Sequence, residues 1–140
     1  MAIVMDIEAL NAFLAREFPQ IADSFVVDHV DAAELIARLI VGPQHLRPGG
    51  TVSGPSIFAL ADVAIYCAIL SRIGPVALAV TTSASVDFLR KPAAGQDLRA
   101  HCRLLKLGRL LAVADTLIYS QGLPDPVARA AMTYAIPPKA

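Results

Sequence analysis

The chain has 140 residues, enough for one domain with a buried core, and it is 56% hydrophobic but only 17% charged. Its 12 basic and 12 acidic residues cancel, and no basic stripe or RNA-binding aromatic signature marks a nucleic-acid protein. A mean hydropathy of +0.58 is unusually apolar for a small domain, so we expect apolar surface to be buried between the subunits of a homodimer or homotetramer.

The first predicted element is an amphipathic helix over residues 7–18, where apolar residues recur at helical spacing. Asp6 is placed to cap this helix, and Pro19 ends it. Two short strands and a loop rich in Pro and Gly follow, over residues 25–30, 34–41 and 42–50.

Residues 54–72 are apolar on every side of a helix, which predicts a buried helix that ends at Gly74 and Pro75. All later segments have the pattern of strands, and short turns between consecutive strands predict antiparallel pairing. The four long strands are expected over residues 77–90, 98–107, 110–120 and 127–136.

These elements predict an α+β fold in which an antiparallel sheet wraps one long buried helix. We expect one domain over residues 1–140, with the N-terminal helix in residues 1–20 and the core in residues 21–140. No internal repeat, low-complexity tract or linker divides the chain.

The apolar stretch over residues 55–70 is about 16 residues long, shorter than the roughly 20 that span a bilayer, and Asp62 lies in its middle. The N-terminus lacks the basic region of a signal peptide. The cysteines, Cys67 and Cys102, lie far apart in apolar segments, as buried thiols of a reduced, cytoplasmic protein do. The three histidines have no metal-ligand spacing, so we expect no metal.

Asp62 is the one charged residue between Gly54 and Leu70. An unpaired buried charge costs several kcal/mol, so this carboxylate needs a partner, water or a proton. Two interpretations are open: a structural carboxylate held by hydrogen bonds, and a catalytic carboxylate in a cleft. At the start of the helix, Ser53 is a good N-cap, and the free N–H groups of the first turn favour a carbonyl oxygen that gains negative charge.

Asp62 lies eight residues beyond Gly54, which is roughly 12 Å along a helix axis at 1.5 Å per residue. One helix therefore cannot easily present both its N-terminal N–H and this carboxylate to one small reacting group. Two antiparallel copies across a twofold axis could do so. The spacing thus predicts a site at a dimer interface, present twice in each dimer.

The stretch RPGGTVSGP, followed by SIFALADVA, resembles the hotdog-fold thioesterases, in particular the branch that includes the phenylacetic-acid-pathway thioesterases. In that branch a motif of the form N-x-x-G-x-x-H-G-G opens the central helix, and an acidic residue follows nine positions after the His. The later segments FLRKPAAG and LLKLGR resemble the family's strand-to-turn and Gly-Arg hairpin segments. The resemblance covers residues 38–136 and implies a hotdog fold.

The resemblance implies a role for several residues. Gly54 matches the glycine whose N–H polarises the thioester carbonyl, and Asp62 matches the acid that acts as general base on water or as nucleophile. Thr82 matches a Ser or Thr that helps to hold the water, and Tyr66, one turn beyond Asp62, should line the same cleft. No cofactor is implied, since coenzyme A is part of the substrate.

Three positions depart from the motif: Arg47 stands at its Asn, Ser53 at its His and Pro55 at its second Gly. Arg47 accepts no hydrogen bond and brings a fixed positive charge, which could donate to the thioester carbonyl or pair with Asp62. All three departures favour a second interpretation, in which the fold binds acyl-CoA or an acyl carrier without turnover.

The leading interpretation is an acyl-CoA thioesterase that hydrolyses a short-chain or aromatic acyl-CoA through water activated by Asp62. A third interpretation, a hydratase or dehydratase, normally requires a His beside the acid. The CoA phosphates need cations, and four candidates lie near predicted strand ends, namely Arg90, Lys91, Lys106 and Arg109. The predicted acyl cleft is lined by Ile57, Phe58, Tyr66 and Phe88.

Overall fold

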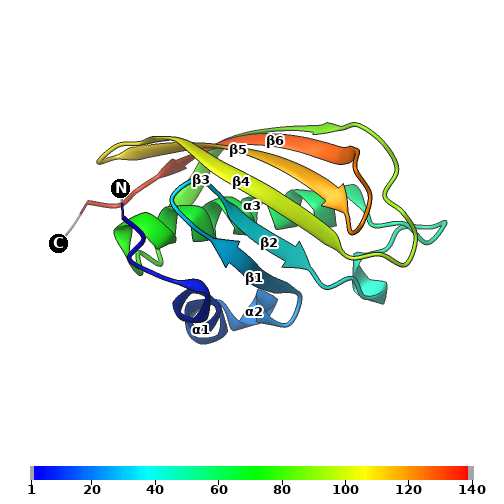
Figure 1. Cartoon of the computed structure of the whole chain (residues 1–140), viewed down its shortest axis with the longest axis horizontal. Helices are drawn as coiled ribbons and strands as arrows, with labels where there is room; N and C mark the ends of the chain where they lie inside the picture. Colours follow the sequence, from blue (N-terminus) through cyan, green and yellow to red (C-terminus); the bar gives the residue numbers. More distant parts are fainter. Residues whose placement is uncertain (1, 139–140) are drawn as a thin grey trace.

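A six-stranded antiparallel sheet curves around one long helix in the computed structural model, which describes residues 2–138 (Figure 1). The sheet order is β1-β2-β4-β5-β6-β3. In chain order the elements are α1 (Ile7–Glu17), α2 (Pro19–Ala22), β1 (Phe25–Val30), β2 (Leu35–Leu39), the 3-10 helix η1 (Pro43–His45), α3 (Gly54–Ile73), β3 (Val80–Phe88), β4 (Leu98–Leu107), β5 (Leu111–Ser120) and β6 (Pro126–Ala135). The predicted sheet wrapped around one buried helix is confirmed.

The pairing of β3 corrects one sequence-based expectation. A short turn between the third and fourth strands predicts that they pair, but β3 pairs with β6, and β4 pairs with β2 and β5. Residues 89–97 therefore connect two strands that are not neighbours in the sheet. As a result β3 is an edge strand, with one side of its backbone unpaired in the chain.

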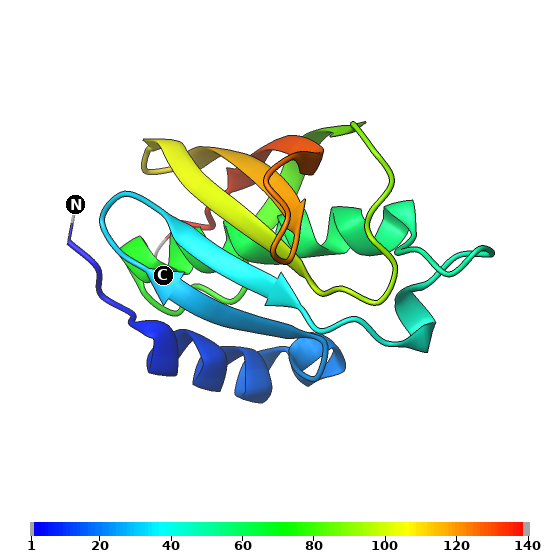
Figure 2. The ribbon, with the colours of Figure 1, turned by 45° about the vertical axis from the view of Figure 1, so that its right-hand side comes forward.

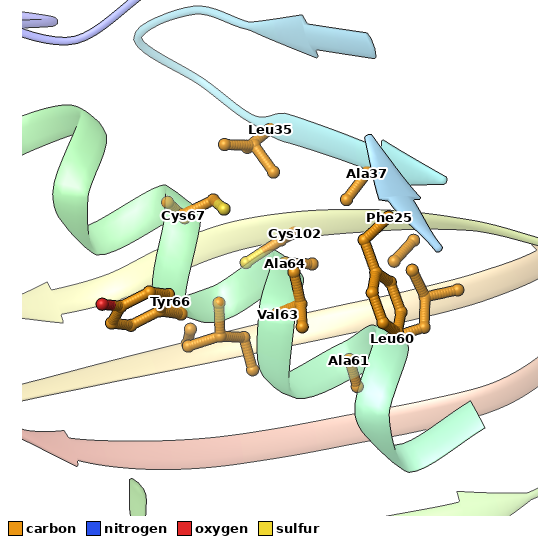
Figure 3. Close-up of a cluster of buried hydrophobic side chains, with 14 of the residues drawn as sticks. Phe25, Leu35, Ala37, Leu60, Ala61, Val63, Ala64, Tyr66, Cys67 and Cys102 are labelled. Atoms are coloured by element: carbon orange, nitrogen blue, oxygen red, sulfur yellow. The ribbon is translucent and has the colours of Figure 1, made fainter. Parts of the chain in front are cut away.

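Helix α3 fills the concave side of the sheet because it is apolar almost all round. The Ser53 side chain caps it by accepting a hydrogen bond from the Ser56 N–H at 3.4 Å. By length and composition α3 could cross a membrane, since a stretch of 18 residues within it has a mean hydropathy of 1.7. However, 67% of that stretch is buried inside the protein. Residues of α3 and of the sheet interdigitate, with Cys67 and Cys102 between them (Figure 3). This helix is thus the core of the fold.

One stripe of α3 is left open by the sheet. Pro55 and Phe58 are exposed and Asp62 is half-buried, and their spacing of three and four residues puts them on one helix face. The edge strand β3 lies beside this stripe and exposes Val80 and Phe88, each at 56%. We call these five residues the open face. Its apolar area is the kind of surface that a second chain covers.

Helix α1 packs against β1 and reaches α3, as Figure 2 shows from a second side. Asp6 caps it, since its carboxylate accepts a hydrogen bond from the Ala9 N–H at 2.9 Å. The Asn11 side chain accepts from the Val27 N–H at 2.9 Å and donates to the Val27 carbonyl at 3.1 Å, which ties α1 to β1. The predicted N-terminal helix is confirmed, and Pro19 begins the short helix α2 after it.

Candidate active site

Asp62 lies in the wall of a cavity of about 420 Å³, which we call the Asp62 cavity. Besides Asp62, α3 contributes Tyr66 to it, and the junction of α1 and α2 contributes Phe18. The edge strand β3 contributes Thr81, and β6 contributes Tyr134. Four elements that are distant in sequence therefore meet around one carboxylate.

Both hydrogen bonds to the Asp62 carboxylate reach the same oxygen. The Thr81 hydroxyl donates to Oδ1 at 2.5 Å, and the Tyr134 hydroxyl donates to Oδ1 at 2.6 Å. Tyr134 also lies 3.1 Å from the main-chain carbonyl oxygen of Asp62. Within residues 2–138, Oδ2 forms no hydrogen bond and no ion pair. The carboxylate is thus held on one side and free on the other.

A bulge in β3 decides which threonine reaches Asp62. Thr81 is paired with Tyr134, whereas Thr82 has no place in the register of the two strands. The Thr82 hydroxyl is exposed and donates to the Thr133 carbonyl at 3.2 Å. Within one chain Thr81, and not Thr82, therefore stands beside Asp62, and the role of Thr82 in holding the water stays a prediction. The alternation of side chains along a strand cannot reveal such a shift. The extra residue in the bulge moves every side chain on one side of it to the opposite face of the sheet.

Tyr134 is a site residue that the sequence analysis missed. Its ring is buried, and burial, followed by the charge of Asp62, raises the pKa of Tyr134 above its ordinary value. The hydroxyl therefore stays protonated and able to donate. No local sequence pattern points to Tyr134, because its position depends on the order of the strands in the sheet. The last strand of the chain, β6, lies between β5 and β3, so its residues face α3 beside Asp62.

Tyr66 lines the Asp62 cavity, as its position one turn beyond Asp62 predicts. Its hydroxyl donates to the Ala77 carbonyl at 2.8 Å, and its ring lies edge-on to Phe18 with 6.4 Å between centroids. A further contact of 6.2 Å joins the rings of Tyr66 and Tyr134. One side of the cavity is therefore an aromatic wall.

Gly54 borders a second cavity of about 470 Å³, the Gly54 cavity. A Cβ added to Gly54 would lie 3.5 Å from the Phe88 ring, so the glycine leaves the helix tip open. Within residues 2–138, no hydrogen bond from the Gly54 N–H is formed. This amide is consequently free to bind an external acceptor.

Three cations border the Gly54 cavity, namely Arg47, Arg90 and Lys91, and none of its lining residues within the described chain is acidic. A tight turn presents Arg47: its N–H donates to the Thr51 carbonyl at 2.9 Å, and the turn includes Gly50 at φ 85°, in the left-handed region. The cavity is therefore positively charged around the Gly54 amide. Arg47 and Asp62 lie in different cavities, so no ion pair joins them within the chain.

The other predicted binding residues are distributed unevenly. Ser53 caps α3, whereas Pro55 and Phe58 are exposed on α3 and line neither cavity. Lys106 and Arg109 lie at the β4–β5 turn, near the end of α3 remote from Gly54 (Figure 1). Within one chain these two cations therefore lie apart from Arg90 and Lys91, and their part in binding CoA phosphates stays a prediction. Of the four predicted acyl-cleft residues, only Tyr66 lines the Asp62 cavity. Ile57 and Phe88 border the Gly54 cavity instead, and Phe58 borders neither.

The two cysteines are buried between α3 and the sheet, where burial raises the pKa of Cys67 and of Cys102 to about 12. We predict that a thiol reagent at pH 8 labels the native protein only in trace, and labels both cysteines after denaturation. Absorbance of the released chromophore measures this. Rapid labelling of native protein would contradict the prediction.

His45 is buried and structural: its Nδ1 accepts from the Gly42 N–H at 2.9 Å.

Comparison with known proteins agrees with this architecture. The Thioesterase superfamily matches residues 49–126 of the chain. A crystal structure from Silicibacter sp. TM1040, described as a "putative thioesterase", is 56% identical, with a TM-score of 0.93 over 99% of this chain and 96% of that one. A mutant of the phenylacetic acid degradation protein PaaI from Thermus thermophilus is 30% identical, with a TM-score of 0.71 over 84% of this chain and 97% of that one. The Pseudomonas aeruginosa protein named "Putative esterase PA0474" is 33% identical over 88 residues, which span 62% of this chain and 65% of that protein.

An antiparallel sheet of this topology around one central helix is the hotdog fold, so the predicted fold is confirmed. The chain belongs to the Thioesterase superfamily. The predicted resemblance is thereby confirmed, with PaaI structures among the neighbours, and so is the predicted class of thioester hydrolase.

Proposed function

We propose that the protein hydrolyses acyl-CoA thioesters at a site shared by two copies of the chain. One observation carries this proposal: the free Gly54 amide and the free oxygen of Asp62 belong to two cavities that have no lining residue in common. Both groups lie on α3, roughly 12 Å apart along the axis. A single chain therefore cannot apply both to one thioester, whereas two antiparallel copies can.

The open face supports this assembly. It exposes Phe58 of α3, at 39%, next to the edge strand β3. An exposed apolar edge strand is a template for pairing with another chain. A twofold axis near this face would cover the exposed side chains and bring Asp62 of one copy to Gly54 of the other. A homodimer is therefore the smallest active unit of the proposal.

The proposed reaction begins when the thioester carbonyl oxygen accepts a hydrogen bond from the Gly54 N–H. The Asp62 carboxylate of the other copy removes a proton from water, and the water oxygen bonds to the carbonyl carbon. The negative charge on the resulting oxyanion is stabilised by the Gly54 N–H and the positive end of α3. The C–S bond then breaks, the leaving sulfur takes the proton from Asp62, and the products are a carboxylic acid and coenzyme A.

Coenzyme A would lie on the Gly54 side of the site. Its phosphates carry several negative charges, and Arg47, Arg90 and Lys91 surround this cavity without a competing carboxylate in the described residues. Arg47 at the motif's Asn position adds a cation and a donor close to the carbonyl. The charge of this cavity therefore matches the thiol half of an acyl-CoA.

The acyl group would enter the Asp62 cavity. The aromatic wall of Phe18, Tyr66 and Tyr134 borders a volume of about 420 Å³, which suits a short-chain or an aromatic acyl group. Phe18 lies at the junction of α1 and α2, so the N-terminal helix contributes to the choice of substrate.

We predict that Phe18→Ala shifts specificity toward longer acyl chains. Removing the ring lengthens the cavity, and the ratio of kcat/KM for octanoyl-CoA over that for butyryl-CoA should rise by about tenfold, the scale of one or two methylenes in an apolar pocket. Taking a ratio cancels any loss of folded protein. Phe18→Leu keeps most of the volume and serves as the matched control. An unchanged ratio in Phe18→Ala would remove Phe18 from the acyl site.

A panel of acetyl-, butyryl-, octanoyl-, benzoyl- and phenylacetyl-CoA tests the proposed function, with release of coenzyme A followed by a thiol reagent. We expect turnover of at least one short-chain or aromatic member. Tight binding of the panel by calorimetry without any thiol release would identify a non-catalytic acyl-CoA binding protein instead. Because the protein's own thiols are buried, the background is low.

A further inference from the structure

The hydrogen bonds around Asp62 distinguish its two carboxylate oxygens. A carboxylate oxygen has two lone-pair directions, and on Oδ1 both are occupied, by the hydroxyls of Thr81 at 2.5 Å and Tyr134 at 2.6 Å. Oδ1 is therefore saturated and has no free lone pair for a proton from water. Oδ2 keeps both lone pairs, on a residue that borders the Asp62 cavity.

The position of Tyr134 is itself fixed from several sides. Its ring is buried at 3% exposure and contacts Tyr66, and its place on β6 is directly opposite Thr81 on β3. Its hydroxyl lies 3.1 Å from the Asp62 main-chain carbonyl, which fixes it relative to the helix backbone as well as to the side chain. The phenol oxygen is therefore held in place beside Oδ1, the nearer of its two acceptors on Asp62.

We propose that Tyr134 is a positioning residue, which with Thr81 holds Asp62 through Oδ1 and so assigns the reaction with water to Oδ2. The effect of this positioning role on catalysis rests on the proposed function, whereas the hydrogen bonds to Oδ1 do not depend on it. The titratable groups that border the same cavity are Glu17, Tyr66 and Tyr134, and the neighbouring thiol of Cys67 is buried.

Tyr134→Phe tests this role, because it removes one hydroxyl and keeps the ring. We expect kcat to fall by about tenfold with little change in KM, as for loss of one hydrogen bond to a charged group. A variant that only loosened the packing would disturb the acyl cavity and raise KM as well. An unchanged kcat, or a fall in kcat matched by a rise in KM, would mean that Tyr134 only supports packing, and would overturn the proposal.

The control is Tyr119→Phe on β5, whose ring packs edge-on to His101 at 5.2 Å and borders neither cavity. It should leave both kcat and KM unchanged. Should Tyr134→Phe fail to fold, Thr81 provides a second variant on the edge strand. Thr81→Val should likewise lower kcat with little change in KM, and Thr81→Ser, which restores a hydroxyl, should restore kcat.

Carbon-13 NMR of labelled aspartate carboxyls separates this inference from the proposed function. The Asp62 signal is assigned from its absence in Asp62→Asn, and its chemical shift at pH 7 is compared in wild type and Tyr134→Phe. We expect the chemical shift to change in the variant, because Oδ1 loses a hydrogen-bond donor, whether or not acyl-CoA is turned over. An identical chemical shift would overturn the positioning role, whereas a changed one in a protein without thioesterase activity would overturn only the function.

Discussion

Asp62→Asn is expected to lower kcat for acyl-CoA hydrolysis by about a thousandfold, within the range that a positioned general base contributes. The amide oxygen can still accept hydrogen bonds from Thr81 and Tyr134, so the fold and the cavity should persist. The variant loses only the ability of Oδ2 to take a proton from water, because an amide nitrogen stands in its place. KM should therefore stay close to the wild-type value, and steady-state kinetics with the best substrate of the panel measure both.

The matched control is Asp125→Asn, which neutralises an exposed carboxylate in the turn between β5 and β6, outside both cavities. It should retain wild-type kinetics. Full activity in Asp62→Asn would remove Asp62 from the chemistry. A single turnover in 18O-labelled water then tests for the nucleophilic role: label in the peptide that contains Asp62 would establish nucleophilic attack by Asp62, whereas label only in the acid product is the result expected of a general base.

Local sequence patterns sufficed to predict most of the fold. Helix α3 was expected over residues 54–72 and spans Gly54–Ile73, because Ser53 caps one end and Gly74, at φ 95°, ends the other. Asp62 and Gly54 could also be predicted from the sequence. A lone carboxylate in an apolar helix and a glycine at the start of that helix can both be recognised without knowing how distant segments meet.

The rest of the site depends on contacts between distant segments. Thr81 replaces Thr82 because of a bulge, and bulges leave no mark on a period-two pattern. Tyr134 reaches Asp62 only because β6 inserts between β5 and β3, an order that short turns cannot specify. Likewise, the sequence shows that Lys106 and Lys91 lie near strand ends, but it cannot show that these two strand ends lie at different ends of the molecule.

A mixture of two inactive variants is expected to recover activity if the site is shared between chains. Asp62→Asn lacks the base, and Gly54→Val places methyl groups in front of the helix-tip amide. The backbone of Gly54 is not in the left-handed region and an added Cβ would meet only the Phe88 ring at 3.5 Å, so the second variant should fold. Alone, Gly54→Val should lose about a hundredfold in kcat, as for loss of one donor to an oxyanion.

In a mixed dimer, the intact Gly54 of one variant meets the intact Asp62 of the other, while the second site is doubly defective. Random exchange of equal amounts makes half of the dimers mixed, so activity should recover to about a quarter of wild type. The variants are unfolded together, refolded and compared with each variant refolded alone, and light scattering checks that all three samples are dimers. Since a site confined to one chain would gain nothing from mixing, activity that stays at the sum of the two variants would refute the shared site, and with it the reason for two separate cavities on one helix.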